Sequence, residues 1–392
     1  MKLGILKDIK NGEYRVVLTP AEVYSCIEDG HEVYVEHDAG AMAGFADEEY
    51  VEAGAVIKTK EEIFGACDLV TKVKEIEPSE FDLLRENQMI FSCIHPAANP
   101  EEVQALLDKK VVSFAAEDTH RYGSPNCEAA GKTGAFMGLY ALMAINGGKG
   151  KFVSGLGAAP GINVLVLGCG VVGMGAIEVM QCMGANVTVA ARNIGNLRAL
   201  NARYDGKINT MISNSYNLKE ILPHTDVVVN CVRWDKSNTT PMITREMVKS
   251  MGKGSVIVDV SNDYGAIETF HETTYADPMY IEEGVVHYCV SNLPSAISNT
   301  ASIAYAASLE KHIRSLLNNG PAEACVRDGY LRRGMVTYKG YLTHEETSQI
   351  QGRPWIQPEK ILKIEDRKLD PAPKNTVAKS DNFYEEKDVC LC

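Results

Sequence analysis

One stretch, residues 164–192, constrains the fold of this chain most strongly: VLVLGCGVVGMGAIEVMQCMGANVTVAAR. An apolar run stops at Gly168, and Gly170 and Gly173 follow where a helical pattern begins. This spacing directly after a strand lets a dinucleotide pyrophosphate rest on a helix N-terminus. The first glycine permits the tight turn, the second admits the phosphates, and the third lets helix and strand pack closely. A second apolar strand at 187–190 completes a β-α-β unit. The sequence therefore predicts a dinucleotide site formed by Gly168, Gly170, Val171, Val172 and Gly173.

The end of that second strand bears on which dinucleotide is preferred. Chains that bind NAD usually carry an acidic residue there, which binds the ribose 2′-hydroxyl. This chain has Ala191 and Arg192 instead. A guanidinium with no carboxylate beside it suits a 2′-phosphate, so NADP(H) is favoured and NAD(H) is the alternative. For Arg192 the competing interpretation is a side chain that simply points into solvent.

Bulk composition excludes several classes of protein. The net charge of −13 argues against a nucleic-acid partner or an anionic membrane surface. No apolar stretch is long enough to span a membrane, and no signal-peptide pattern follows Met1. The 11 cysteines are odd in number and form no C-x-x-C pair. This usage predicts reduced cysteines in a cytoplasmic protein, with neither a disulfide framework nor a metal site.

The patterning predicts an α/β protein with two Rossmann-like, doubly wound parallel-sheet domains and a cleft between them. Strand-like and helix-like segments alternate through the first 120 residues without a glycine-rich phosphate loop. A long helix of small and apolar residues, 126–147, connects the domains, and an amphipathic helix at 300–319 returns the chain to the first domain. The expected division is a substrate domain, 1–125 plus 299–365, a dinucleotide domain, 126–298, and a polar disordered tail, 366–392.

Four polar residues follow predicted strands and are candidates for chemistry. Arg15 follows the first strand, Lys74 ends the strand LVTKVK, and His95 follows the apolar run MIFSCI. Asp263 follows the buried strand SVIVDVSN of the other domain. The carboxyl ends of parallel strands line the ligand crevice of such sheets, so this set suits hydride chemistry on a small charged substrate. Taken singly, each has a plainer alternative: a surface charge, a structural histidine or a helix cap.

Several motifs resemble those of the alanine dehydrogenases and the related nucleotide-binding subunit of transhydrogenase. They are KLGILKDIKNGEYRVVLTP, LVTKVKE, MIFSCIHPAAN, VLVLGCGVVGMGA, VIVDVSNDYG, HYCVSNLPSAISNTAS and GMVTYKGYLT. The resemblance covers residues 1 to about 345 in order. The lysine–oxoglutarate reductase and N-carboxyethyl-ornithine synthase branches share this plan. The segment NCVRWDKSNTTPMITREM, with Arg233 and Trp234, is more similar to the saccharopine-forming branch.

The resemblance implies a role for each matched residue. Arg15 would bind the substrate carboxylate, and Lys74 would hold the carboxylate or the carbonyl oxygen. His95 would be the acid/base residue, and Asp263 the catalytic aspartate. Asn292, in SNLP, would lie in the loop that borders the nicotinamide.

This sequence also departs from the family pattern. The family's NAD-selecting aspartate is Ala191 here, and the serine that often touches the cofactor phosphate is Cys127. The D-Q-G-G segment reads DYGA at 263–266. These departures bear on the cofactor and the exact substrate rather than on the type of reaction.

The resemblance thus implies an NAD(P)-dependent oxidoreductase that reversibly aminates a 2-oxo acid such as pyruvate, by hydride transfer to an imine. One alternative is an NADPH-dependent opine- or saccharopine-type synthase, which joins a 2-oxo acid to the side-chain amine of ornithine or lysine. A second is a transhydrogenase-like nucleotide-binding subunit or a cofactor sensor. We also expect a homo-oligomer, a hexamer or a dimer, with the helix at 126–147 as its interface.

Overall fold

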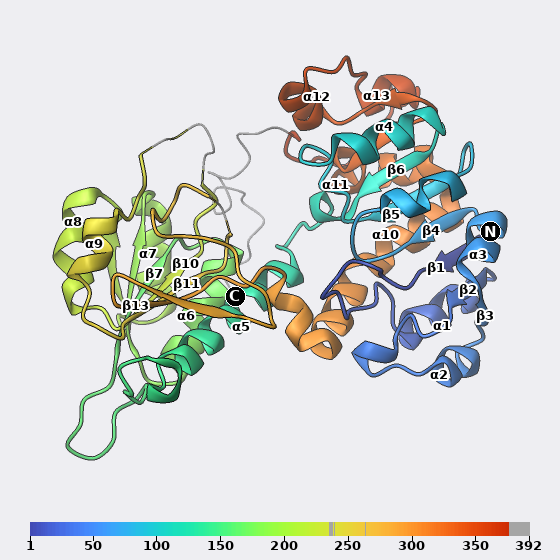
Figure 1. Ribbon diagram of the computed structural model, residues 1–392. Coiled ribbons are helices and arrows are strands. Elements are labelled where there is room, and N and C mark those ends of the chain that lie inside the picture. The colour runs from blue at the N-terminus through green and yellow to red at the C-terminus, as the bar shows by residue number, and fades with distance from the viewer. Residues whose placement is uncertain (235–237, 239, 263, 376–392) are drawn as a thin grey trace. The chain divides into compact units, whose positions relative to one another are not determined.

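The computed structural model describes residues 1–234, 238, 240–262 and 264–375. The chain divides into two compact units (Figure 1). Unit 1 joins Met1–Pro125 to the chain from Ser298 onward, and unit 2 is Asn126–Ile297. Early and late segments of the chain therefore share one unit. Among the described residues, no helix has both the length and the apolar character needed to cross a membrane.

Unit 1 is built on an eight-stranded sheet with the order β15-β14-β6-β5-β4-β1-β2-β3. The six strands from the N-terminal part of the chain are parallel to their neighbours, whereas β14 and β15 run antiparallel. Strands β4, β5 and β6 consist of buried residues, as expected for parallel strands covered on both faces. The bounds are β1 (Lys2–Ile5), β2 (Glu32–Glu36), β3 (Val56–Lys58), β4 (Leu69–Thr71), β5 (Met89–Ser92), β6 (Val112–Ala115), β14 (Met335–Tyr338) and β15 (Tyr341–Leu342).

The helices of unit 1 begin at clear sequence signals. Thr19 and Thr59 form capping boxes at the starts of α1 and α3. The long α10 is kinked at Gly320, which has a φ of 70° and precedes Pro321. The bounds are α1 (Pro20–Glu28), η1 (Ala41–Ala43), α2 (Asp47–Glu52), α3 (Lys60–Ala66), η2 (Pro78–Leu83), α4 (Pro100–Asp108), η3 (Ala116–Asp118), α10 (Ser298–Arg327), α11 (Gly329–Arg333), α12 (Glu345–Gln351) and α13 (Pro358–Ile361), where η marks a 3₁₀ helix.

Unit 2 holds a seven-stranded sheet with the order β12-β13-β11-β10-β7-β8-β9. Its first strand, β7, lies in the middle, so the chain winds to one side through β8 and β9 and to the other through β10, β11 and β13. This is the strand order of a doubly wound dinucleotide fold, extended by the antiparallel β12. The bounds are β7 (Asn163–Leu167), β8 (Asn186–Ala191), β9 (Asn209–Ile212), β10 (Val227–Asn230), β11 (Val256–Asp259), β12 (Met279–Glu282) and β13 (Val285–Tyr288).

The small residues of α5 let it pack backbone to backbone against α6. A Cβ on Gly131 would lie 1.9 Å from the carbonyl oxygen of Val172, and one on Gly175 would lie 2.6 Å from that of Glu128. Larger side chains would hold the two helices apart. The helices of unit 2 are α5 (Pro125–Ala141), η4 (Ala144–Asn146), α6 (Val171–Cys182), α7 (Ile194–Arg203), α8 (Ser215–Ile221), η5 (Leu222–His224), α9 (Arg245–Ser250) and η6 (Leu293–Ile297).

The predicted α/β fold class is confirmed, but the two sheets are mixed rather than purely parallel. Each antiparallel addition is a hairpin closed by two residues with positive φ: Glu283 and Gly284, and Lys339 and Gly340. Such two-residue turns match the twist of the strands that they join. The expected helix at 126–147 ends earlier, at Ala141, and is followed by η4.

The tail expected to be disordered from residue 366 is ordered as far as the structure describes it. Asp370 accepts hydrogen bonds from the amide of Gly329, at 2.8 Å, and from Arg121. Asn375 is buried and donates to Asp118 at 3.0 Å. Residues 376–392 lie outside the described residues. Polar side chains that find partners on unit 1 thus order a segment whose composition alone predicts disorder.

Candidate functional site

Four neighbouring parallel strands deliver the candidate residues of unit 1 to one edge of the sheet. The strands β6, β5, β4 and β1 are adjacent and parallel, so their carboxyl ends lie side by side. Arg15 lies in the loop after β1, Lys74 follows β4, and His95 follows β5. The structure therefore brings these three predicted residues to the same edge.

Arg15 is buried and fixed by a carboxylate close to it in sequence. Its Nε donates to Oε1 of Glu13 at 2.7 Å, and its NH2 contacts Oε2 of the same residue. Burial disfavours the charged form, but the paired Glu13 carboxylate outweighs it, so the pKa of Arg15 is raised. The guanidinium is thus a permanent, pre-positioned cation.

The two lysines after β4 occupy different environments, although side chains two residues apart would share one face of a regular strand. Lys72 is wholly buried, and its Nζ lies 2.9 Å from Oε2 of Glu80 and 4.0 Å from Oδ1 of Asp8. Lys74 is partly exposed, and its backbone amide donates to Oδ2 of Asp8 at 2.8 Å. The buried lysine thus supports Asp8, the carboxylate that fixes the backbone of Lys74.

His95 has a strained backbone, with a φ of 47°. Its amide donates to Oε1 of Glu117 at 2.6 Å, and its ring Nδ1 lies 3.4 Å from the same oxygen. The side chain is 43 % exposed, yet burial among surrounding protein atoms, followed by the charge of Lys74, lowers the pKa of His95 to about 4. The ring is therefore neutral near pH 7.

Glu117 is a candidate that the sequence analysis missed. Burial, followed by the charge of Asp118, raises the pKa of the Glu117 carboxyl to about 8. Its Oε2 is buried and makes no hydrogen bond with any described residue. The rule that found His95 could have found it, because Glu117 follows the apolar strand β6.

In unit 2, the glycine-rich turn after β7 has the conformation predicted from its sequence. Gly168 has a φ of 88°, and its amide donates to the carbonyl of Ala190 at 2.9 Å. A Cβ on Gly173 would lie 2.2 Å from the carbonyl oxygen of Gly168, whereas one on Gly170 would meet nothing within 4 Å. Gly170 is the N-cap of α6 and provides no side chain to cap it. This tight turn with open space above a helix N-terminus fits a dinucleotide pyrophosphate.

The remaining cofactor candidates lie in different settings. Ala191, the last residue of β8, is buried, and Arg192 directly after it is exposed. Both follow Ala190, whose carbonyl accepts a hydrogen bond from the Gly168 amide in the glycine-rich turn. Cys127 lies in the first turn of α5, about one helical turn before the Gly131 that packs on the Val172 carbonyl. The first turn of α5, at Glu128, packs on Gly175 in the second turn of α6.

Two further candidates lie after later strands of unit 2. Asn292 has a φ of 58°, and its carbonyl accepts from the Tyr275 hydroxyl at 3.2 Å. Asp263 lies outside the described residues. Asp259 closes β11, is buried, and accepts two hydrogen bonds of 3.1 Å from Asn230.

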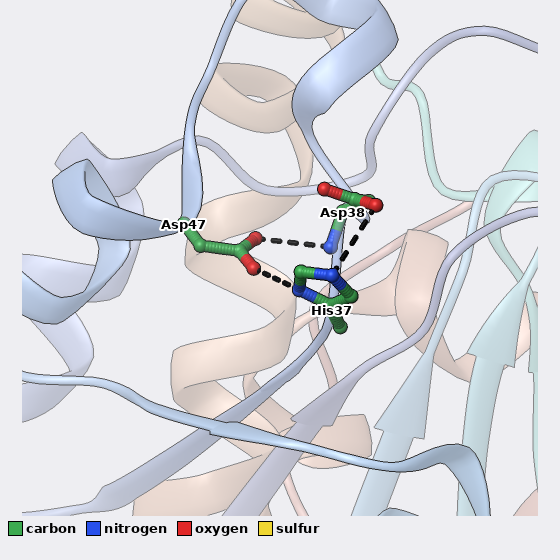
Figure 2. Close-up of side chains that lie close together, drawn as sticks. All are labelled: His37, Asp38 and Asp47. Carbon is green, nitrogen blue, oxygen red and sulfur yellow. Dashed lines mark hydrogen bonds and ion pairs between the residues drawn. The ribbon is translucent and has the colours of Figure 1, made fainter.

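One group of potential metal ligands occurs among the described residues, in unit 1 (Figure 2). The ring Nδ1 of His37 pairs with Asp47, and its Nε2 lies 3.4 Å from Oδ2 of Asp38. The amide of Asp38 also donates to Asp47 at 3.0 Å. These groups satisfy one another, and two of the three side chains are largely exposed. We therefore assign them no metal.

Comparison with known proteins places this chain in a family. The family models for the N-terminal and C-terminal domains of "Alanine dehydrogenase/PNT" match residues 4–126 and 134–345. An alanine dehydrogenase of Methanococcus maripaludis is 36% identical over 371 residues, which cover 92% of this chain and 100% of the relative.

Solved structures agree with this placement. An L-alanine dehydrogenase superposes with a TM-score of 0.84 at 32% identity, covering 90% of this chain and 99% of the other. A transhydrogenase from Sinorhizobium meliloti, at 22% identity, shares the fold with a TM-score of 0.74 over 88% of this chain and 99% of the other. The chain therefore belongs to the alanine dehydrogenase/PNT family.

Proposed function

We propose that this protein is an NAD(P)-dependent amino acid dehydrogenase that interconverts a 2-oxo acid such as pyruvate, ammonia and the L-amino acid. The observation that supports this proposal most directly is that Arg15, Lys74 and His95 follow the adjacent strands β1, β4 and β5 at one edge of the sheet. In addition, the chain matches relatives named alanine dehydrogenase over their full length. A 2-oxo acid carries a carboxylate and a carbonyl, which these cations and the imidazole suit.

In the proposed mechanism, the two cations bind and orient the substrate. Arg15 binds the carboxylate, and its pairing with Glu13 holds the guanidinium in place without requiring the substrate to order it. Lys74 holds the second carboxylate oxygen or the carbonyl oxygen and polarises the carbonyl toward attack by the amine. Electrostatic stabilisation of this kind needs charges that are set in advance.

His95 moves the proton on the oxygen that leaves as water. In the free protein its ring is neutral, because burial and the Lys74 charge lower its pKa. A bound carboxylate offsets the Lys74 charge, so the pKa of His95 rises in the complex toward the range where it transfers protons in both directions. Asp263 would orient the amine. The turn after β7 would hold the dinucleotide, and its nicotinamide would supply the hydride that reduces the imine carbon.

Within this proposal the cofactor is NADP(H). Support comes from the end of β8, where Ala191 offers no carboxylate and the exposed Arg192 follows it. We expect Ala191→Asp to raise the Kd for NADPH by tenfold or more and to lower that for NADH, since a carboxylate repels the 2′-phosphate and binds the 2′-hydroxyl. Equal NADPH affinity in both proteins would contradict the assignment.

We also propose a homo-oligomer that buries the outer face of α5 and the loop after it. Phe136 and Tyr140, one turn apart on α5, are 60% and 39% exposed. In the segment that follows, Ile145, Phe152 and Leu156 are 82%, 63% and 80% exposed. Several exposed apolar side chains along consecutive segments are typical of an association surface. Light scattering should show an oligomer that Phe136→Glu with Leu156→Glu dissociates, and a wild-type monomer would refute this.

The activity is tested by a panel of amines and cofactors on the purified protein. NADPH and NADH oxidation would be followed with pyruvate plus ammonium, ornithine or lysine. We expect turnover with ammonium. Turnover only with ornithine or lysine would support the opine- or saccharopine-type alternative, and tight cofactor binding without any turnover would support a binding subunit or sensor.

A further inference from the structure

A buried polar pair joins α10 to the end of β5 in unit 1. The Tyr305 hydroxyl lies 2.9 Å from Sγ of Cys93, which follows β5 and precedes His95 by two residues. Tyr305 is wholly buried, and Cys93 is nearly so. A buried hydroxyl is costly unless it is paired, so a phenylalanine would fill this place at lower cost if packing were the only need.

The same face of α10 also holds the loop that carries Arg15. The Val16 amide, next to Arg15, donates to Oγ of Ser302 at 3.0 Å. Ser302 and Tyr305 are three residues apart in the helix and therefore share a face. One face of α10 thus fixes both the backbone beside Arg15 and the Cys93 thiol.

The charges of the candidate cations act on the pair. The charge of Arg15 acts on both Cys93 and Tyr305, and that of Lys74 acts on Cys93. Burial raises the pKa of Cys93 to about 12 and that of Tyr305 well above its usual value, so both groups stay neutral. Because O–H is the better donor, the phenol proton goes to sulfur. The phenol oxygen then keeps lone pairs that can accept, and the positive charge of Arg15 acts on it.

We propose that the Cys93–Tyr305 pair positions the Arg15 guanidinium for the carboxylate of the substrate. The inference rests on the proposed function, in which Arg15 binds that carboxylate. Tyr305 is a positioning residue here, since it acts through Arg15. Glu13 already holds the guanidinium by hydrogen bonds. The Tyr305 hydroxyl would add a second influence, from a helix far along the chain.

The test is Tyr305→Phe, which removes only the hydroxyl. We expect the KM for pyruvate to rise about three- to tenfold, as for the loss of one hydrogen bond, while kcat and the KM for the cofactor stay within about twofold. Ser113→Ala is the matched control: Ser113 is also wholly buried in unit 1, and its hydroxyl lies 2.7 Å from that of Thr337. The control should leave the KM for pyruvate unchanged.

Two further variants make the test decisive. Cys93→Ser keeps a hydrogen-bonding partner for Tyr305 and should retain most of the pyruvate affinity, whereas Cys93→Ala should lose that affinity. This pair of variants tests the inference even if Tyr305→Phe fails to fold. In an Arg15→Lys background, Tyr305→Phe should cause no further loss of kcat/KM. An unchanged KM in Tyr305→Phe, or equal effects of Tyr305→Phe and Ser113→Ala, would overturn the inference. An inactive wild-type protein would instead refute the proposed function.

Discussion

Replacing Gly173 with alanine tests whether the turn after β7 holds the cofactor. The new Cβ would lie 2.2 Å from the Gly168 carbonyl oxygen and 2.8 Å from its carbon. Unstrained carbon contacts lie near about 3.5 Å, so the turn must move by about 1 Å. Overpacking of this kind costs about 1–3 kcal/mol. In a unit of this size each kcal/mol shifts the Tm by about 2–4 °C, so the Tm should fall by about 2 to 12 °C.

Two other glycines separate the effect on folding from the effect on binding. A Cβ on Gly170 meets nothing within 4 Å, so Gly170→Ala should keep the wild-type Tm but weaken nucleotide binding, because the methyl group would enter the phosphate space. Gly65 lies in α3 of unit 1, also in open space. Gly65→Ala should raise stability by up to about 1 kcal/mol and leave binding unchanged.

The assay is thermal unfolding together with calorimetric titration of NADPH and NADH. We expect Gly173→Ala to lose both stability and nucleotide affinity, Gly170→Ala to lose affinity alone, and Gly65→Ala to lose neither. A Gly173→Ala protein that keeps the wild-type Tm and binds NADPH as tightly as the wild type would refute it.

Four more results follow from unit 1. His95→Ala should lower kcat by about 10²- to 10⁴-fold with an intact fold. Since its pKa is lowered to about 4, the neutral form of His95 persists as pH falls through 6.5, so the acid limb of kcat/KM should lie well below 6.5; a limb at 6.5 or above would contradict this. Lys72→Met should cost about 3 kcal/mol in urea unfolding, because Glu80 loses a buried cation; a loss below about 1 kcal/mol would count against it. Asn375→Ala should lower the Tm and speed proteolysis of the C-terminal segment, and unchanged proteolysis would argue against this anchor.

The sequence predicts those parts of the fold whose signals are local. Three glycines predict the turn after β7, and apolar runs predict the buried parallel strands. Both predictions agree with the structure. The neighbouring positions of Arg15, Lys74 and His95 follow from the strand order, which the alternation of strands and helices makes predictable.

What the sequence does not reveal depends on contacts between distant segments. The order of residues 366–375 comes from partners such as Arg121 and Asp118, which lie some 250 residues earlier in the chain. The pairing of Tyr305 with Cys93 joins residues that are 212 positions apart. The raised pKa of Glu117 depends on burial, which its position after a strand does not specify. These features require the folded structure because no local pattern encodes them.

The most direct measurement supplies the protein with pyruvate, ¹⁵N-ammonium and NADPH and identifies the product by mass spectrometry. If the protein reduces an imine of pyruvate and ammonia, one molecule of ¹⁵N-labelled L-alanine forms for each NADPH consumed. A product without the label, or no product from a folded protein that binds the cofactor, would contradict the proposed activity.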